Sequence, residues 1–187
     1  MNIQKADLPM LATYTRILAS IPLVLCVAFG APYSVWPAAV IFILASITDW
    51  LDGYLARKFN AESDMGKLMD PIADKIIVLS ALIMLLWLER VDPYAVILLL
   101  GRDIYIGGIR SVAATQRIII AAKPFGKWKT AFQMISIPCL LVYQPNEFFN
   151  LPIDKIGYFT LWVSVALSIV SAIQYTLGFY KQKASEP

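Results

Sequence analysis

Four aspartates lie in one short stretch of a chain that is otherwise very apolar. Asp49 and Asp52 come first, and Gly66, Asp70 and Asp74 follow after a polar interval. On a helix, residues three or four apart share one face, so each aspartate pair would point the same way. If two neighbouring helices turn these faces toward each other, four carboxylates line one cavity and repel unless a cation sits among them. Hard divalent ions with oxygen ligands fit such a set.

Such a cluster indicates phosphoryl-type chemistry. Two divalent ions roughly 4 Å apart could clamp a pyrophosphate and stabilise both the attacking and the leaving oxygen. Gly53 and Ala56 leave the same helix face bare, so a flat or bulky group can approach the backbone. One acid that serves less as a ligand could take the proton of an incoming hydroxyl. A cluster of this kind, set within the headgroup layer of a membrane, suits a substrate with a phosphate and a fatty tail.

The composition indicates a membrane protein. The 187 residues are 59% hydrophobic and 16% charged, which is too apolar for a soluble domain of this size. The chain has no histidine, which excludes a histidine base, a Ser-His-Asp triad and histidine-ligated zinc. Cys26 and Cys139 lie in apolar runs and are expected to be buried small side chains, not a disulfide. We expect one transmembrane domain over residues 1–187, and a first apolar run that is not a cleavable signal.

Six apolar stretches predict six transmembrane helices, each near the ~20 residues that a bilayer requires. The expected spans are 8–30, 35–59, 66–88, 94–117, 127–143 and 153–180. Turn-forming residues separate the spans, and the segment Lys123-Pro124-Phe125-Gly126 is expected to break the chain before the fifth. The predicted fold is therefore all-α and polytopic.

The distribution of basic residues predicts the orientation. Seven of the 16 lysines and arginines lie in or beside the loops after the second and fourth spans, Lys5 precedes the first span, and Lys181 and Lys183 follow the last, whereas the other three loops offer only Arg90 and Lys155. Both termini and these loops should therefore face the cytoplasm. About fourteen apolar residues precede Asp49 and about fourteen follow Asp74, or roughly 21 Å of helix. Both acid pairs are thus expected just inside the cytoplasmic leaflet, where ionisable residues indicate function.

The aspartate stretch resembles the signature of the CDP-alcohol phosphatidyltransferases. The matching positions are Asp49, Asp52, Gly53, Ala56, Arg57, Gly66, Asp70 and Asp74. The start of the chain is similar to the first-helix pattern of the bacterial members at Pro9, Thr13 and Arg16. It departs from that pattern at Met10, where asparagine is usual. The resemblance extends over residues 8 to 135 or so.

This resemblance implies a reaction and roles for residues. Family members transfer a phosphatidyl group from CDP-diacylglycerol to an alcohol and release CMP. They require Mg²⁺ or Mn²⁺ and are typically homodimers with six transmembrane helices. Two ions would be bound by Asp49, Asp52, Asp70 and Asp74, and Asp74 would also act as the general base. CDP-diacylglycerol would be held by Thr13, Gly53, Ala56, Arg57, Ser63 and Gly66.

Basic residues near the inner ends of the fourth and fifth spans indicate the acceptor. These residues are Arg110, Arg117, Lys123, Lys127 and Lys129. A phosphate-bearing acceptor requires such a cationic pocket, whereas serine or choline does not. Glycerol 3-phosphate is therefore the expected acceptor and inositol phosphate the second choice. We assign the acceptor phosphate to Arg102, Arg110, Lys127 and Lys129, although Arg102 lies near mid-membrane and could instead pair with Asp103.

The same region resembles one branch of the family, the one that makes phosphatidylglycerol phosphate. The resemblance rests on Arg102-Asp103, Arg110 and the run from Gly126 to Thr130, and position 103 is more often glutamate in that branch. The expected location is a bacterial inner (cytoplasmic) membrane, with the active site on the cytoplasmic side. The expected partners are CDP-diacylglycerol, glycerol 3-phosphate, membrane lipid and a second copy of the chain, and no nucleic acid.

Other functions use similar residues. A transporter also has acids and arginines within the membrane, but it would place polar groups through the whole membrane thickness. A non-catalytic lipid-binding protein would not require four acids at metal-binding spacing. The aspartates could also form structural ion pairs, although buried pairs contribute little net stability. The same transfer onto a second phosphatidyl lipid, as in cardiolipin synthesis, stays open.

Overall fold

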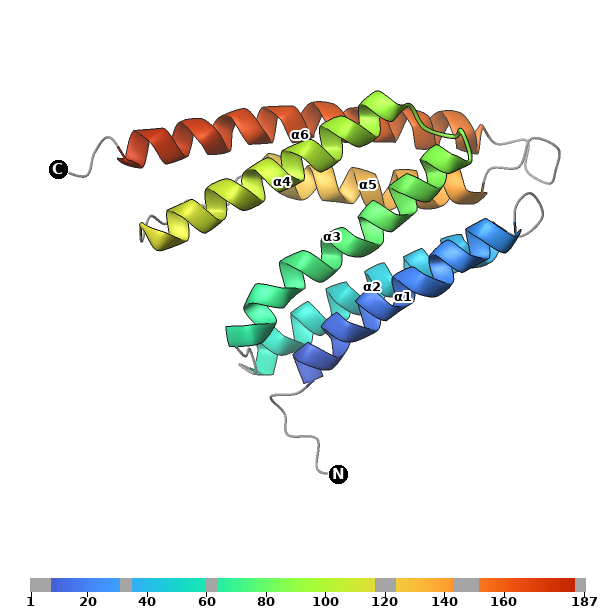
Figure 1. Ribbon diagram of the computed structural model, residues 1–187, viewed down its shortest axis with the longest axis horizontal. Helices are drawn as coiled ribbons and strands as arrows, with labels where there is room; N and C mark the ends of the chain where they lie inside the picture. The colour runs from blue at the N-terminus through green and yellow to red at the C-terminus, as the bar shows by residue number, and fades with distance from the viewer. Residues whose placement is uncertain (1–7, 31–34, 60–63, 117–123, 143–151, 184–187) are drawn as a thin grey trace. The chain divides into compact units, whose positions relative to one another are not determined.

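The computed structural model describes residues 8–30, 35–59, 64–116, 124–142 and 152–183, and only the backbone at 8–14, 16, 49–59, 64–74 and 124. Over these ranges the chain forms six α-helices and no strand (Figure 1). The helices are α1 (Leu8–Gly30), α2 (Trp36–Phe59), α3 (Asp64–Trp87), α4 (Pro93–Thr115), α5 (Pro124–Val142) and α6 (Ile153–Lys183). The predicted all-α class is confirmed for the residues described.

The helix bounds follow the predicted spans closely, with differences at the start of α5 and at the end of α6. The prediction that the chain breaks from Lys123 to Gly126 is wrong in part, because α5 already begins at Pro124. Proline is favoured in the first helical turn, where its missing N–H would have no intrahelical partner. At the other end of the chain, α6 continues to Lys183, past the predicted end at Tyr180.

The chain divides into two compact units. Unit 1 comprises residues 1–90 and 137–148, and unit 2 comprises 91–136 and 149–187. The helix α5 therefore contributes its first part to unit 2 and its last turns to unit 1. The expectation of a single domain stays a prediction.

Among the described side chains, the interior of unit 1 is mostly apolar. Helix α1 packs against both α2 and α3. Its residues Leu23 and Val27 are fully buried, as are Phe42 of α2 and Leu82 and Leu85 of α3. The four-residue spacing within α1 places both of its side chains on one face. Burial of these side chains holds α1, α2 and α3 together in one compact unit.

The turn after α3 is tied to the end of α5, within unit 1. Glu89 adopts a left-handed conformation with φ 57°. The N–H groups of Glu89 and Arg90 donate back to carbonyls in the last turn of α3, which is the Schellman pattern of helix ends. The guanidinium of Arg90 donates to the carbonyls of Leu140 and Leu141 at 3.0 and 2.8 Å. These carbonyls lie in the last turn of α5, where intrahelical donors are missing.

In unit 2, α4 and α6 pack directly against each other and run parallel. The buried face of α6 is unusually polar and includes Thr160, Ser164, Ser168 and Ser171. Small hydroxyl side chains let helices approach closely and can bond across the interface, which is common in membrane helices. The interior of unit 2 therefore offers several polar partners for groups on the neighbouring helices.

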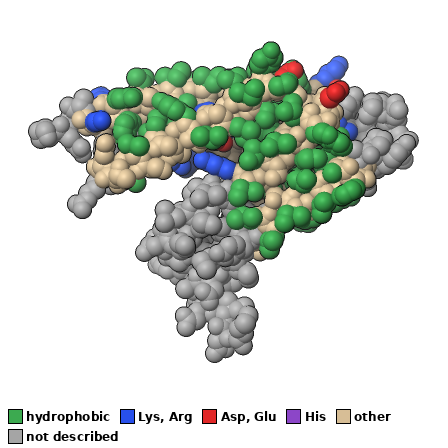
Figure 2. All heavy atoms as spheres, in the orientation of Figure 1, with side chains coloured by type: hydrophobic (Ala, Val, Ile, Leu, Met, Phe, Trp, Pro, Cys, Tyr) green, Lys and Arg blue, Asp and Glu red, His purple; other side chains and the backbone are tan. Residues whose placement is uncertain are grey.

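Hydrophobic side chains cover much of the visible surface of the described residues (Figure 2). Phe29, Ile104 and Phe159 are among the most exposed. By length and composition, α6 is the helix of the described part that could cross a membrane. Shorter apolar stretches lie at Ile17–Gly30, Trp36–Thr48 and Lys75–Trp87. Both cysteines are free, as expected, but they are half-buried rather than buried.

Candidate active site

Both halves of the aspartate motif lie on continuous helix. α2 is helical through Asp49 and Asp52 to its end at Phe59, so these acids share a face. α3 is helical from Asp64 through Asp70 and Asp74, which are one turn apart. The two helices contact each other within unit 1. The helical spacing on which the metal prediction depends is thus confirmed, whereas coordination by these side chains lies outside the description and stays a prediction.

The donor set fits the ions that the motif implies. Carboxylate oxygens are the preferred ligands of Mg²⁺ and Mn²⁺, and each acid pair lies along one face of a helix in the same unit. The residues assigned to CDP-diacylglycerol flank these acids along the chain. Gly53, Ala56 and Arg57 lie in the last turns of α2, Gly66 lies in the first turn of α3, and Thr13 lies in α1. Ser63 lies outside the described residues.

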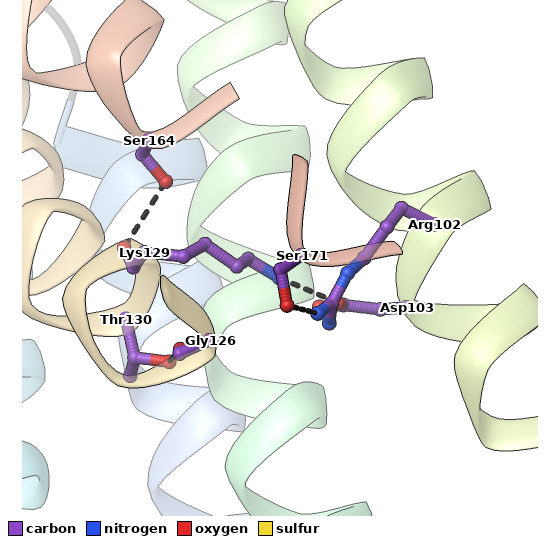
Figure 3. A network of polar contacts seen from close by, with 7 residues as sticks. All are labelled: Arg102, Asp103, Gly126, Lys129, Thr130, Ser164 and Ser171. Atoms are coloured by element: carbon purple, nitrogen blue, oxygen red, sulfur yellow. Dashed lines mark hydrogen bonds and ion pairs between the residues drawn. The ribbon is translucent and has the colours of Figure 1, made fainter. Parts of the chain in front are cut away.

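A charged cluster joins the three helices of unit 2 (Figure 3). One carboxylate oxygen of Asp103 in α4 accepts hydrogen bonds from Lys129 Nζ in α5 at 2.5 Å and from Arg102 Nη1 at 2.9 Å. Arg102 Nη2 donates to the hydroxyl of Ser171 in α6 at 2.8 Å. Four side chains from three helices thus meet through charge-assisted bonds, which are stronger than neutral ones. We call these four residues the Asp103 cluster.

The Asp103 cluster brings two cations to one carboxylate in the interior of unit 2. Lys129 is only 3% exposed, and its ammonium shares one carboxylate with Arg102. Ser164 Oγ donates to the backbone carbonyl of Lys129 at 3.1 Å, which fixes α5 against α6. A Cβ at Gly126 would lie 3.4 Å from Ser171 Oγ, so α5 and α6 are close to each other here.

Three buried polar atoms of unit 2 have no hydrogen-bond partner among the described residues. They are Arg102 Nε, Gln133 Nε2 and Ser168 Oγ. Buried polar atoms in proteins are nearly always satisfied, by protein, water or ligand. The two nitrogen atoms can only donate hydrogen bonds, so they favour an electron-rich partner such as a phosphate oxygen or a water.

The four residues assigned to the acceptor phosphate fall into two groups. Arg102 and Lys129 belong to the Asp103 cluster. The ion pair between Arg102 and Asp103 is the alternative to phosphate binding that the sequence analysis left open for Arg102. Arg110 and Lys127 are exposed. Arg117 and Lys123 lie outside the described residues.

Sequence reasoning missed two contacts from α6. Ser171 binds Arg102, and the ring of Tyr175 lies 5.5 Å from Arg110 Cζ. Both residues belong to the buried face of α6, and their spacing of four residues predicts a shared face. No signal in the sequence indicates which residues of α4 they meet.

The comparison with known proteins assigns the class. The sequence profile of the CDP-alcohol phosphatidyltransferases matches residues 6–170, which is most of the chain. This protein belongs to the CDP-alcohol phosphatidyltransferase family, and the resemblance of its aspartate motif is thereby confirmed.

Relatives with a named activity narrow the class further. A protein of Rickettsia bellii named CDP-diacylglycerol–glycerol-3-phosphate 3-phosphatidyltransferase is 34% identical over 169 residues, which are 90% of this chain and 93% of that protein. A Bacillus subtilis protein of the same name is 38% identical over 141 residues, or 73% and 70% of the two chains. An Arabidopsis thaliana protein, numbered 2 under that name, is 41% identical over 152 residues, or 72% and 63%.

Proposed function

We propose that this protein is an enzyme of phospholipid biosynthesis that transfers the phosphatidyl group of CDP-diacylglycerol to glycerol 3-phosphate, giving phosphatidylglycerol phosphate and CMP. Membership of the family supports the donor and the reaction type. The names of relatives that align with most of the chain support the acceptor.

One observation of this structure carries the choice of a phosphorylated acceptor. In unit 2 the two cations of the Asp103 cluster share one carboxylate, and a buried guanidinium nitrogen of Arg102 has no partner among the described residues. Arg110 and Lys127 add two exposed cations. An uncharged acceptor hydroxyl would gain nothing from these groups, whereas a phosphate gains charge-assisted hydrogen bonds. We therefore assign the acceptor phosphate to Arg102, Arg110, Lys127 and Lys129.

The chemical step requires a nucleophile, a base and a leaving group. Asp74 accepts the proton of the acceptor hydroxyl. The oxygen then attacks the phosphorus that carries diacylglycerol, and the bond from this phosphorus to the bridging oxygen breaks, so CMP leaves with that oxygen. Bound Mg²⁺ or Mn²⁺, two ions held by Asp49, Asp52, Asp70 and Asp74, would supply charge stabilisation at the pyrophosphate. The cytidine and phosphates are assigned to Thr13, Gly53, Ala56, Arg57, Ser63 and Gly66.

We further propose that all six helices cross a bacterial inner membrane, with both termini and the active site on the cytoplasmic side and with two chains forming a homodimer. The 31 residues of α6 correspond to roughly 46 Å of helix, more than the roughly 30 Å hydrocarbon core. The 19 residues of α5, the shortest helix of the described part, correspond to roughly 28 Å. Membrane lipid is then both the surrounding solvent and the source of the donor substrate.

A single assay tests donor, acceptor and base. The purified protein in detergent, with CDP-diacylglycerol and Mg²⁺, is given glycerol 3-phosphate, inositol phosphate or serine, and CMP release is measured. We expect release only with glycerol 3-phosphate and a decrease of at least ~100-fold in Asp74→Asn, because the proton then lacks its acceptor. Asp154→Asn in the first turn of α6 is the matched control and should keep its rate.

The outcomes separate the alternatives. Release with inositol phosphate instead would keep the family chemistry and overturn the acceptor. Release with a second phosphatidyl lipid would indicate cardiolipin-type synthesis. A folded protein that releases no CMP with any acceptor would refute the enzyme assignment, and ion flux in proteoliposomes would then test the transporter.

A further inference from the structure

The ring of Tyr175 in α6 lies beneath an arginine that the proposed function assigns to the acceptor. Arg110 Cζ of α4 is 5.5 Å from the centroid of this ring. Tyr175 is only 8% exposed, whereas Arg110 is exposed. A guanidinium within about 6 Å of an aromatic face is attracted by the negative face of the ring. The exposed, charged side chain thus rests on a ring that is itself held in the interior.

The position of the ring is set by the register of two parallel helices. Hydrogen bonds join α4 and its N-cap residue to α6 between residues that are 66 to 71 apart along the chain, and these pairs are Asp92–Tyr158, Arg102–Ser171 and Tyr105–Thr176. Ala113 and Phe179 pack together on the same two helices, with Ile109 against them. Contacts before and after Tyr175 along α6 therefore fix its position along the helix axis relative to Arg110.

An arginine that is already seated binds a phosphate more readily than one that is free. A free arginine loses much of its rotamer freedom when it clamps a ligand, and this entropy loss weakens binding. A ring that restricts the side chain beforehand removes part of that loss, and it leaves the N–H edge of the guanidinium available because the attraction acts through the flat face. The ring can therefore improve binding without touching the ligand.

We propose that Tyr175 is a positioning residue for glycerol 3-phosphate, which it serves by seating Arg110. This inference rests on the proposed function, and it deepens it by making acceptor affinity depend on an α6 residue outside the aspartate motif. A residue that only fills the core would affect stability and both substrates alike. A positioning residue affects the acceptor alone.

The test compares side chains at position 175 that differ in ring electronics but not in shape. Tyr175→Phe keeps the aromatic face and should keep the KM for glycerol 3-phosphate. A tetrafluorinated phenylalanine, inserted at the same position, keeps the shape but weakens the negative face, and should raise this KM. Tyr175→Leu removes the ring and should raise the KM about two- to fivefold, the range expected for an exposed cation–π contact. The KM for CDP-diacylglycerol should not change.

The matched control is Tyr180→Leu, at an exposed tyrosine on the same helix. It should leave both KM values unchanged. Equal KM values for glycerol 3-phosphate in the Phe, fluorinated and Leu proteins would overturn the proposal. So would a parallel rise in the KM for both substrates, or the same rise in the control.

A second readout does not depend on turnover. The Nε–H signal of Arg110 in ¹⁵N-arginine-labelled protein, assigned through Arg110→Lys, should show an aromatic ring-current shift that Tyr175→Leu abolishes. Titration with glycerol 3-phosphate should move this signal, with half-saturation at about two- to fivefold higher concentration in Tyr175→Leu. If the wild type binds in this way but releases no CMP, the proposed function fails and the positioning role stands. If turnover is normal and half-saturation does not differ, the positioning role fails and the proposed function stands.

Discussion

Removal of the carboxylate from the Asp103 cluster should destabilise the protein strongly. In Asp103→Asn, the buried ammonium of Lys129 and the guanidinium of Arg102 lose the anion that they share. The side chains of Lys129 and Asp103 are 4% and 18% exposed, so water replaces little of that lost interaction. Loss of one partner of a buried ion pair costs about 3–5 kcal/mol. For a chain of 187 residues, this corresponds to a decrease in Tm of about 6–20 °C.

Matched variants separate the charge from the packing. Asp103→Glu keeps the anion and should lose much less stability than Asp103→Asn. Lys129→Met leaves Arg102 paired with Asp103, so the remaining pair is neutral overall. The double variant Asp103→Asn/Lys129→Met lacks one of the two cations that depend on this carboxylate, so it should be more stable than Asp103→Asn alone.

The assay is thermal unfolding in detergent at one scan rate, followed with a dye that becomes fluorescent on binding thiols. Cys26 and Cys139 are free and half-buried, so their exposure reports unfolding. An Asp103→Asn protein that unfolds at the wild-type temperature would refute the reasoning. The same holds if the double variant shows only the sum of the two single losses, because the cations would then not depend on the shared carboxylate.

Two further predictions concern the turn after α3. Arg90→Met should lower the free energy of unfolding by about 2–3 kcal/mol, because the carbonyls of Leu140 and Leu141 lose a charged donor. Arg90→Lys keeps a charged donor and should lose less stability. Equal thermal stability of Arg90→Met and the wild type would contradict this role. Glu89→Gly should raise the free energy of unfolding by about 1 kcal/mol, or the Tm by about 2–4 °C, because glycine adopts the left-handed conformation without penalty. Glu89→Ala should bring no gain. A gain of the same size in Glu89→Ala would show that removal of the charge, and not the backbone conformation, is responsible.

Much of the fold could be predicted because it is local. Apolar stretches of membrane length, separated by turn residues, gave helix bounds within a few residues of those observed. The error at Pro124 arose because proline is compatible both with a chain break and with the first turn of a helix. The aspartate motif was also readable, since its residues lie within a short stretch and the regular i to i+4 hydrogen bonds fix how they share a face.

The contacts of the residues assigned to the acceptor phosphate could not be predicted from the sequence in the same way. The sequence placed Arg102, Arg110, Lys127 and Lys129 together as phosphate ligands, and it offered Asp103 as a neighbour of Arg102. The sequence did not indicate that Lys129, 26 residues further along, shares the same carboxylate and is buried. Positively charged residues near a helix end look alike in a sequence, whether they face solvent or a buried acid.

The sequence by itself determined the family, the helices and the faces that carry the four acids, because each depends on residue types at short, regular spacing. Only the tertiary structure decided that Lys129 is buried and that Arg110 lies over the ring of Tyr175. It also decided that Arg90 caps the end of α5. Ser171 meets Arg102 across 69 residues, and Arg90 meets the end of α5 across 50. Such pairings depend on how whole helices pack and in which register, and this is set by the sum of many weak side-chain contacts rather than by any local pattern.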